Sequence, residues 1–348
     1  PFTTGWSPGG RLSDVTIRPC VATPRPAETP LRRKLLGPVL DDALLVAEFA
    51  GVGQAYRMIG SRVQAAEDAK PPLQGLPKVE LGRPFVMVPG WTTRMERFEA
   101  LGRHLTQDGL NGGEIVFVKN GQYYRDRACT IPMEQGMVTK DHKVFEVLLE
   151  DPHEPPPIVA DELKRNFELI SFCTGSPRLD VDAYSMGGVG TRLYLDRGGN
   201  RVGKLVLLGS GAMGTRFADL SRQIILRDIR FAMSMGGLNV GDLPALEWLG
   251  VDDGKGINNP NLTALNQNWP RQKARIEDLL VLGGDGVATP AAGLWPVTGG
   301  DGLVAASALP PPGEKATVIH GLTHHGYLNS HPQVFTEMKN FFGWKEVG

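Results

Sequence analysis

Residues 179–188 constrain the fold of this chain more than any other stretch. Their sequence, Leu-Asp-Val-Asp-Ala-Tyr-Ser-Met-Gly-Gly, alternates apolar and polar residues and predicts a strand, and the amphipathic residues 189–196 predict a helix. A serine at the tip of a sharp strand-to-helix turn has the layout of a nucleophile elbow. The turn requires small neighbours, here Ala183 and Gly187, two positions on either side of Ser185. So short a match is also compatible with a serine that merely caps a helix.

From residue 83 onward, short apolar runs alternate with amphipathic segments. Such alternation predicts an α/β fold whose mostly parallel sheet is joined by right-handed crossovers. Residues 144–149 fit a strand or a helix, and the rest of 119–157 has no clear assignment. Between residues 282 and 316 we expect a loop rich in glycine and proline. The predicted strands are 84–88, 114–118, 179–184, 204–208, 279–282 and 316–319, and the predicted helices are 95–105, 160–172, 189–196 and 332–342.

The pattern divides the chain into an N-terminal extension, residues 1–80, and a main domain, residues 81–348. The extension begins with an irregular arm that holds one possible strand, 15–21, and continues into a predicted helix within 39–66. Charged residues interrupt that helix, so it cannot span a bilayer, and we expect it to pack on the main domain rather than lie at a membrane surface. Within the main domain, residues 212–275 break the alternation and are interpreted as a cap or lid.

Composition narrows the classes of partner. The chain has 348 residues, 41% of them hydrophobic, and a formal net charge of −1, which gives no reason to expect nucleic acid or an anionic membrane as partner. Its three cysteines, Cys20, Cys129 and Cys173, are far apart, so neither a disulfide scaffold nor a zinc site is indicated. The chain begins at Pro1, and we expect a soluble protein that is either cytoplasmic or secreted with a trimmed leader.

A serine hydroxyl needs a general base, and the base needs an orienting carboxylate. In this type of fold the order along the chain is serine, acid, histidine. Asp301 lies in a loop that follows strand 279–282, and the adjacent His324 and His325 follow strand 316–319. Asp285 is an alternative acid, because it occupies the same Gly-Gly-Asp-Gly tetrapeptide as Asp301. We favour Asp301, since an apolar helix start follows it.

The two neighbouring histidines cannot both point inward, so His324 and His325 remain alternatives for the base at this point. His320, at a strand end, is interpreted as a structural histidine. A tetrahedral intermediate also needs two N–H donors for its oxyanion. The sequence suggests Met186, which follows the serine at a helix N-terminus, and Trp91, which follows the turn Pro89-Gly90 after strand 84–88.

These motifs resemble those of the α/β-hydrolases, and within them the class 2 triacylglycerol lipases of bacteria. Those lipases carry an Ala-His-Ser-Met-Gly elbow, which residues 183–187 match except at Tyr184. Their His-Gly pair corresponds to Pro89-Gly90, so the histidine is missing while the donor position survives. Their C-terminal pattern, glycine then x-x-His-x-Gly-x-Leu-x-Ser, resembles residues 321–330 and implies that His324 is the base, with Asp301 as the acid.

The resemblance covers residues 83–344, is patchy between 119 and 157, and is absent from the N-terminal extension. It implies an α/β-hydrolase domain that hydrolyses carboxylic esters of small molecules or lipids through an acyl-enzyme on Ser185, with no metal or organic cofactor and with transient contact to a lipid interface as a possibility. The alternatives are an amidase, thioesterase, polyester depolymerase or acyltransferase on the same residues, or a binding protein without activity. In the cap, Met213, Met235 and Trp248 are the candidate acyl-pocket residues.

Overall fold

The computed structural model describes residues 43, 46–47, 73, 75–91, 96–230, 233–234, 238–251, 259–291, 294–324 and 331–348. The chain divides into two compact units, Pro1–Ala43 and Leu44–Gly348, and of the first unit only Ala43 is described. The predicted strand 15–21 therefore lies outside the described residues. Of the predicted helix 39–66, residues 43, 46 and 47 are described and helical.

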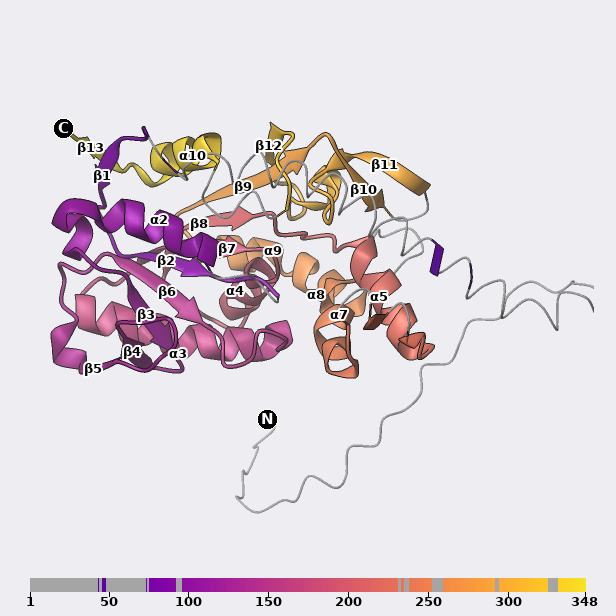
Figure 1. The fold of residues 1–348 in the computed structure, drawn as a ribbon, viewed down its shortest axis with the longest axis horizontal. Helices are drawn as coiled ribbons and strands as arrows, with labels where there is room; N and C mark the ends of the chain where they lie inside the picture. Colours follow the sequence, from indigo (N-terminus) through magenta and orange to yellow (C-terminus); the bar gives the residue numbers. More distant parts are fainter. Residues whose placement is uncertain are drawn as a thin grey trace, which may run out of the picture. The chain divides into compact units, whose positions relative to one another are not determined.

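A nine-stranded sheet forms the centre of the second unit (Figure 1). Its order is β12-β9-β8-β7-β2-β6-β3-β4-β5, and neighbours pair in parallel from β12 to β3, while β4 and β5 are antiparallel at one edge. The strands are β2 (Phe85–Val88), β3 (Val116–Lys119), β4 (Gln122–Tyr124), β5 (Pro132–Met133), β6 (Val144–Leu148), β7 (Leu179–Tyr184), β8 (Val202–Leu208), β9 (Asp278–Asp285) and β12 (Thr317–His320). The predicted strands are present, and the ambiguous segment 144–149 is strand β6.

Helices cover both faces of this sheet, which is why a central strand such as β2 is apolar on both sides. On one face, α3 (Pro156–Thr174) and α4 (Met186–Asp196) pack on the odd-numbered side chains of β7, in a core that includes Leu163, Phe167 and Val189. On the other face, α2 (Glu96–Thr106) and α10 (Pro332–Phe342) pack through residues such as Leu105 and Phe335 (Figure 1). A mostly parallel sheet with helices on both faces and a strand–serine–helix turn at its centre is the α/β-hydrolase fold.

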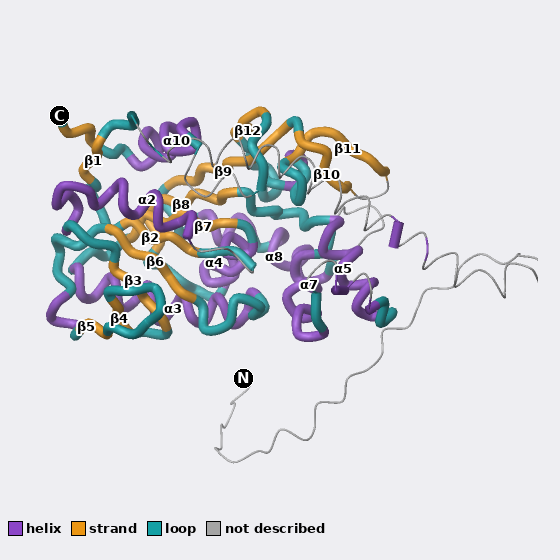
Figure 2. The backbone as a smooth tube through the Cα atoms, in the orientation of Figure 1, coloured by secondary structure: helices purple, strands orange, loops and turns teal. Residues whose placement is uncertain are grey.

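Short elements complete the chain, and Figure 2 shows how loops and turns join them. The two-stranded pairs are β1 (Lys78–Glu80) with β13 (Lys345–Val347), and β10 (Val287–Ala291) with β11 (Leu294–Gly300), both antiparallel. The remaining helices are α5 (Arg216–Leu226), α7 (Leu243–Leu249), α8 (Pro260–Gln267) and α9 (Trp269–Lys273), and the 3-10 turns are η1 (Gln107–Gly112), η2 (Gln135–Met137), η3 (Val240–Asp242) and η4 (Ala306–Ala308).

The expectation of a plain loop between residues 282 and 316 is wrong, because the hairpin β10–β11 and the turn η4 lie there. Pro290 and Pro296 within the hairpin explain the error, since proline cannot donate to a strand ladder and its presence argues against a strand. A two-stranded ribbon tolerates proline, and register shifts interrupt the pairing of these two strands. Asp301 therefore follows β11 directly instead of a loop after β9.

Residues 212–275 are largely helical and contain two parts. Helices α5 and α7 share an apolar cluster of their own, which includes Leu220, Ile224 and Leu246, and Val46 of the N-terminal helix packs against it. The later helices, α8 and α9, contact α4 of the main domain. Arg192 of α4 is fully buried there and donates to Asn266 Oδ1 at 2.7 Å and Gln272 Oε1 at 3.2 Å.

The central strand β7 carries a buried carboxyl that has a predictable effect on stability. Asp182 is fully buried, and neither of its carboxyl oxygens has a hydrogen-bond partner among the described residues. Burial raises the pKa of Asp182 to about 8. An aspartate in the unfolded chain titrates near 3.9, so between about pH 4 and pH 8 the folded state holds a proton that the unfolded state has released.

Between those two pKa values, the free energy of unfolding falls as pH rises, by up to about 1.4 kcal/mol per pH unit. Asp182→Asn removes this dependence, so we expect the variant to gain stability over the wild type steadily from pH 5 to pH 8, as measured by urea denaturation. Asp180→Asn is the matched comparison, because burial, partly offset by Arg83, raises the pKa of Asp180 only to about 6. Parallel stability curves for the wild type and Asp182→Asn would contradict the prediction.

Candidate active site

Ser185 occupies the turn between β7 and α4 and has a strained backbone. Its φ of 51° and ψ of −123° lie in a region that residues other than glycine rarely adopt. The Ser185 N–H donates to the Leu208 carbonyl at 2.9 Å, which ties the turn to β8. Gly187 is required because a Cβ there would overlap the carbonyl oxygen of Pro89. Gly187, two positions after the serine, thus lets the loop that follows β2 approach the turn closely.

His324 links Ser185 to Asp301 through its two ring nitrogens. His324 Nδ1 lies 2.8 Å from Asp301 Oδ2, and His324 Nε2 lies 3.0 Å from Ser185 Oγ. A carboxylate only accepts hydrogen bonds, so Nδ1 carries the hydrogen, and Nε2 is left to accept the serine O–H. Both Asp301 and His324 are buried. The hydroxyl, the imidazole and the carboxylate therefore form one hydrogen-bonded chain.

Backbone groups hold the Asp301 carboxylate in this orientation. Its Oδ1 accepts the N–H groups of Leu303 at 2.9 Å and Val304 at 2.7 Å, which leaves Oδ2 for the imidazole. The backbone of Asp301 takes part as well, because its carbonyl accepts the N–H of His324 at 2.8 Å. The acid and the imidazole are thus joined twice, once through side chains and once through the main chain.

Tyr184 also positions the imidazole, and sequence reasoning assigned it no role. Its hydroxyl donates to the carbonyl of His324 at 2.8 Å, and the two rings lie 5.2 Å apart. Within the predicted strand, nothing in the local sequence distinguishes Tyr184 from a core residue, because its partner lies 140 positions further along the chain.

The alternative acid and base lie elsewhere or outside the described residues. Asp285 ends β9, opposite His320 in the register with β12, and its Oδ1 accepts the N–H of Gly286 at 2.6 Å. The His320 ring lies against Gly286, consistent with a structural role. His325 lies outside the described residues. Of the two Gly-Gly-Asp-Gly tetrapeptides, the one that contains Asp301 contacts the His324 imidazole.

The two proposed N–H donors belong to the start of α4 and to the loop that follows β2. Met186 is the first residue of α4, where helix N–H groups lack partners within the helix. Trp91 follows Pro89 and Gly90, and the contact between Pro89 and Gly187 brings this loop against the serine turn. The Trp91 side chain packs against both the main core and the cluster of α5 and α7.

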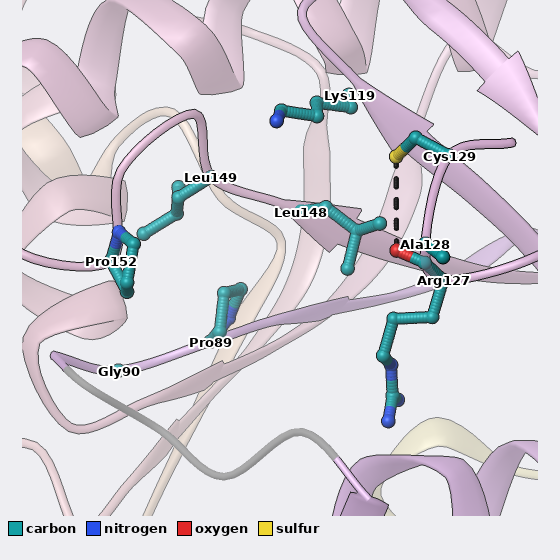
Figure 3. A pocket seen from close by; sticks show the side chains of 9 residues that line it. All are labelled: Pro89, Gly90, Lys119, Arg127, Ala128, Cys129, Leu148, Leu149 and Pro152. Carbon is teal, nitrogen blue, oxygen red and sulfur yellow. Dashed lines mark hydrogen bonds between the residues drawn. The ribbon is translucent and has the colours of Figure 1, made fainter.

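A cavity of about 250 Å³ opens beside this loop (Figure 3). Its wall is mostly apolar, and two basic residues contribute to it. Lys119 Nζ lies 3.6 Å from Glu150 Oε2. Arg127 donates to both carboxylate oxygens of the buried Glu146, at 2.8 and 2.6 Å. Burial raises the pKa of Glu146 to about 7, although Arg127 lowers it. The lining residues are Pro89, Gly90, Lys119, Arg127, Ala128, Cys129, Leu148, Leu149 and Pro152.

The sequence predicted Met213, Met235 and Trp248 as acyl-pocket residues. Met213 and Trp248 are described in the structure, and neither lines this cavity. Met213 lies in the turn after β8, where its N–H donates to the Ala308 carbonyl at 2.9 Å, and Trp248 packs half-buried against the main core. Met235 lies outside the described residues. The cavity escaped sequence reasoning because four separate segments form it, and the only motif among them, Pro89-Gly90, gives no sign that the other three meet it.

Among the described residues, no group of histidine, cysteine, aspartate or glutamate side chains is arranged to hold a metal ion. Across the same part of the chain, no helix combines the length and apolar character needed to cross a bilayer.

A scan against protein-family models finds no match for this chain, and a search of curated proteins finds none either. Solved structures do show a likeness at low identity. A lipase of Bacillus licheniformis in its mature form is 15% identical with a TM-score of 0.47, over 78% of this chain and 96% of that one. A Listeria innocua gene product is 15% identical with a TM-score of 0.45, over 74% and 93%, and a metagenomic carboxyl esterase is 15% identical with a TM-score of 0.41, over 77% of each chain.

Proposed function

We propose that this protein hydrolyses carboxylic esters through an acyl-enzyme on Ser185. The observation that carries the proposal is the continuous hydrogen-bonded chain from Ser185 Oγ through His324 to Asp301, with separations of 3.0 and 2.8 Å. A strained serine at the end of a central strand supports it, because strain of this kind persists where the surrounding structure serves a function.

In the proposed reaction, His324 Nε2 takes the proton of Ser185 as Oγ attacks the ester carbonyl carbon. The N–H groups of Met186 and Trp91 stabilise the negative oxygen of the tetrahedral intermediate. His324 then gives its proton to the alcohol oxygen as the carbon–oxygen bond breaks, and the acyl group stays on Ser185. In a second round, His324 takes a proton from water as the water oxygen attacks the acyl carbon. The bond from that carbon to Ser185 Oγ then breaks, Oγ takes the proton back from His324, and the acid leaves. Asp301 stabilises the imidazolium in both rounds.

The cavity of about 250 Å³ beside Pro89 and Gly90 suits the acyl chain of such an ester. We expect kcat/KM for a series of p-nitrophenyl esters to rise by at most about fourfold per methylene, which corresponds to ~0.8 kcal/mol, and to fall once the cavity is full. Leu148→Ala enlarges the cavity and is expected to move the optimum to longer chains. Met213→Ala is the control, and a shift of the optimum in that variant instead would place the acyl chain under the cap.

Labelling with a fluorophosphonate separates the proposed hydrolase from a binding protein that has the fold without activity. We expect one covalent adduct, located on Ser185 by peptide mass mapping. Labelling without ester turnover at any chain length would favour an amidase, thioesterase, polyester depolymerase or acyltransferase on the same residues. Absence of both labelling and turnover would overturn the proposal.

A further inference from the structure

A second histidine–aspartate pair lies beside the proposed oxyanion loop. His153, in the loop between β6 and α3, has its Nδ1 2.6 Å from Asp242 Oδ1. The two positions lie 89 residues apart in the chain, and the contact joins the loop between β6 and α3 to the segment that carries α7. Asp242 is fully buried, whereas the His153 side chain is 36% exposed. His153 is the side chain that meets Oδ1 of this buried carboxyl group, and a buried polar group is costly to leave without its partner, so the pair links the two segments.

The Asp242 carboxylate is held rigidly on the other side of this link. Its Oδ2 accepts the N–H of Asn239 at 2.7 Å, as part of a capping box at the start of η3. η3 leads directly into α7, and α7 packs against α5. The position of the His153 ring is therefore set by the helices of residues 212–275.

The other side of the His153 ring faces Trp91. The two rings meet edge to face, with centroids 6.2 Å apart and an interplanar angle of 87°. The Trp91 indole packs against both the main core and the α5–α7 cluster. Its Nε1 is buried without a hydrogen-bond partner among the described residues, so packing and not hydrogen bonding holds this ring. Asp242, His153 and Trp91 thus form a chain of contacts that ends at the loop beside the serine.

We propose that His153 is a positioning residue, which couples the seating of the α5–α7 helices to the placement of the Trp91 N–H that stabilises the oxyanion. The inference rests on the proposed function, because it assigns Trp91 its role in that reaction. His153 and Asp242 touch neither the substrate nor the reacting atoms. Their effect reaches the reaction only through the orientation of residue 91.

A backbone donor makes the inference testable, because side-chain changes at these positions leave the N–H of residue 91 intact. We expect His153→Ala to lower kcat for p-nitrophenyl butyrate by roughly 10- to 100-fold, the scale of a misplacement of about 1 Å, with little change in KM. The inhibition constant of a boronic acid, whose tetrahedral adduct on Ser185 places an oxygen at the oxyanion site, should rise by a similar factor. Trp91→Ala should have the same two effects, and the double variant should be no worse than the worse single variant.

Active enzyme is counted by fluorophosphonate titration in every variant, so that a smaller folded fraction is not mistaken for a lower kcat. His153→Gln is the conservative variant: it can still donate to Asp242 but has no aromatic ring for Trp91, and we expect it to recover part of the lost kcat. Arg271→Ala is the matched control, because it breaks a 2.7 Å ion pair with Asp196 that joins α9 to α4 away from Trp91. We expect that control to keep the wild-type kcat and inhibition constant.

Wild-type values of kcat and of the boronic acid inhibition constant in His153→Ala would overturn the inference and leave the proposed hydrolase standing. An equal loss in Arg271→Ala would also overturn it, since the effect would then be general loosening. Failure of the proposed function has a different signature, namely a wild-type protein that neither labels nor turns over ester.

Discussion

Ser185→Ala is expected to lower kcat for the best p-nitrophenyl ester by roughly 10⁶-fold, the scale seen when the nucleophile of a serine hydrolase is removed. The reason is that Ser185 Oγ is the atom to which the acyl group transfers in the proposed reaction, and it lies 3.0 Å from His324 Nε2, the proposed base. Pre-steady-state kinetics should also lose the burst of p-nitrophenol that marks an acyl-enzyme.

The same relay predicts how variants combine. His324→Ala should cost about as much as Ser185→Ala, and the double variant about as much as either, because the two groups act as one unit. Ser210→Ala is the matched control. Ser210 is a buried serine that lies against Gly188 of α4, the helix that follows Ser185, and it has no part in the proposed relay. Losses that multiply in the Ser185/His324 double variant would show that the two residues act independently and would contradict the relay.

Asp301→Asn is expected to lower kcat by roughly 10⁴-fold while leaving the fold intact. An asparagine can keep the oxygen that accepts the N–H groups of Leu303 and Val304, but it places an amide nitrogen opposite His324 Nδ1. That arrangement favours the wrong imidazole tautomer, with the hydrogen on Nε2, so Ser185 loses its base. Thermal denaturation of the variant checks that the fold is retained.

Asp285→Asn is the control that the sequence itself supplies. Asp285 lies in the same Gly-Gly-Asp-Gly context, and its Oδ1 accepts the N–H of Gly286, a bond that asparagine can also make. We expect kcat to stay within about threefold of the wild type, since a change of ~0.6 kcal/mol in the barrier corresponds to that factor. A large loss in Asp285→Asn with activity retained in Asp301→Asn would transfer the acid role to Asp285.

Local sequence was a good guide wherever the structure depends on neighbours in the chain. Central strands such as β2 and β8 are short apolar runs, and the helices that cover them have one apolar face, so periodicity identified both. The hairpin β10–β11 escaped because its prolines and glycines suit a turn equally well. The small residue at Gly187 was predicted as a requirement of the turn, and its contact with Pro89 gives the physical reason.

Contacts between distant segments could not be predicted in the same way. The residues themselves favoured Asp301 over Asp285 only through the apolar positions next to it, and the resemblance to the lipases implied the same choice. In the structure, the return of the chain through β11 brings Asp301 beside His324. The cavity beside Gly90 combines residues from four separate segments, and the pair of His153 and Asp242 spans 89 residues. No periodicity or motif indicates that such segments meet, since each is read from its own neighbours in the chain.

By itself, the sequence determined the alternation of strands and helices, the serine turn and the set of residues able to supply a base and an acid, because these depend on side-chain period, residue size and chemical type over a few neighbouring positions. Only the tertiary structure decided which carboxylate meets the imidazole, that the Tyr184 hydroxyl bonds to the His324 carbonyl, and that a cavity lies beside Pro89 and Gly90. Those outcomes depend on how separate strands are ordered in the sheet, and the pairing of strands far apart in the chain leaves no trace in the residues next to each one.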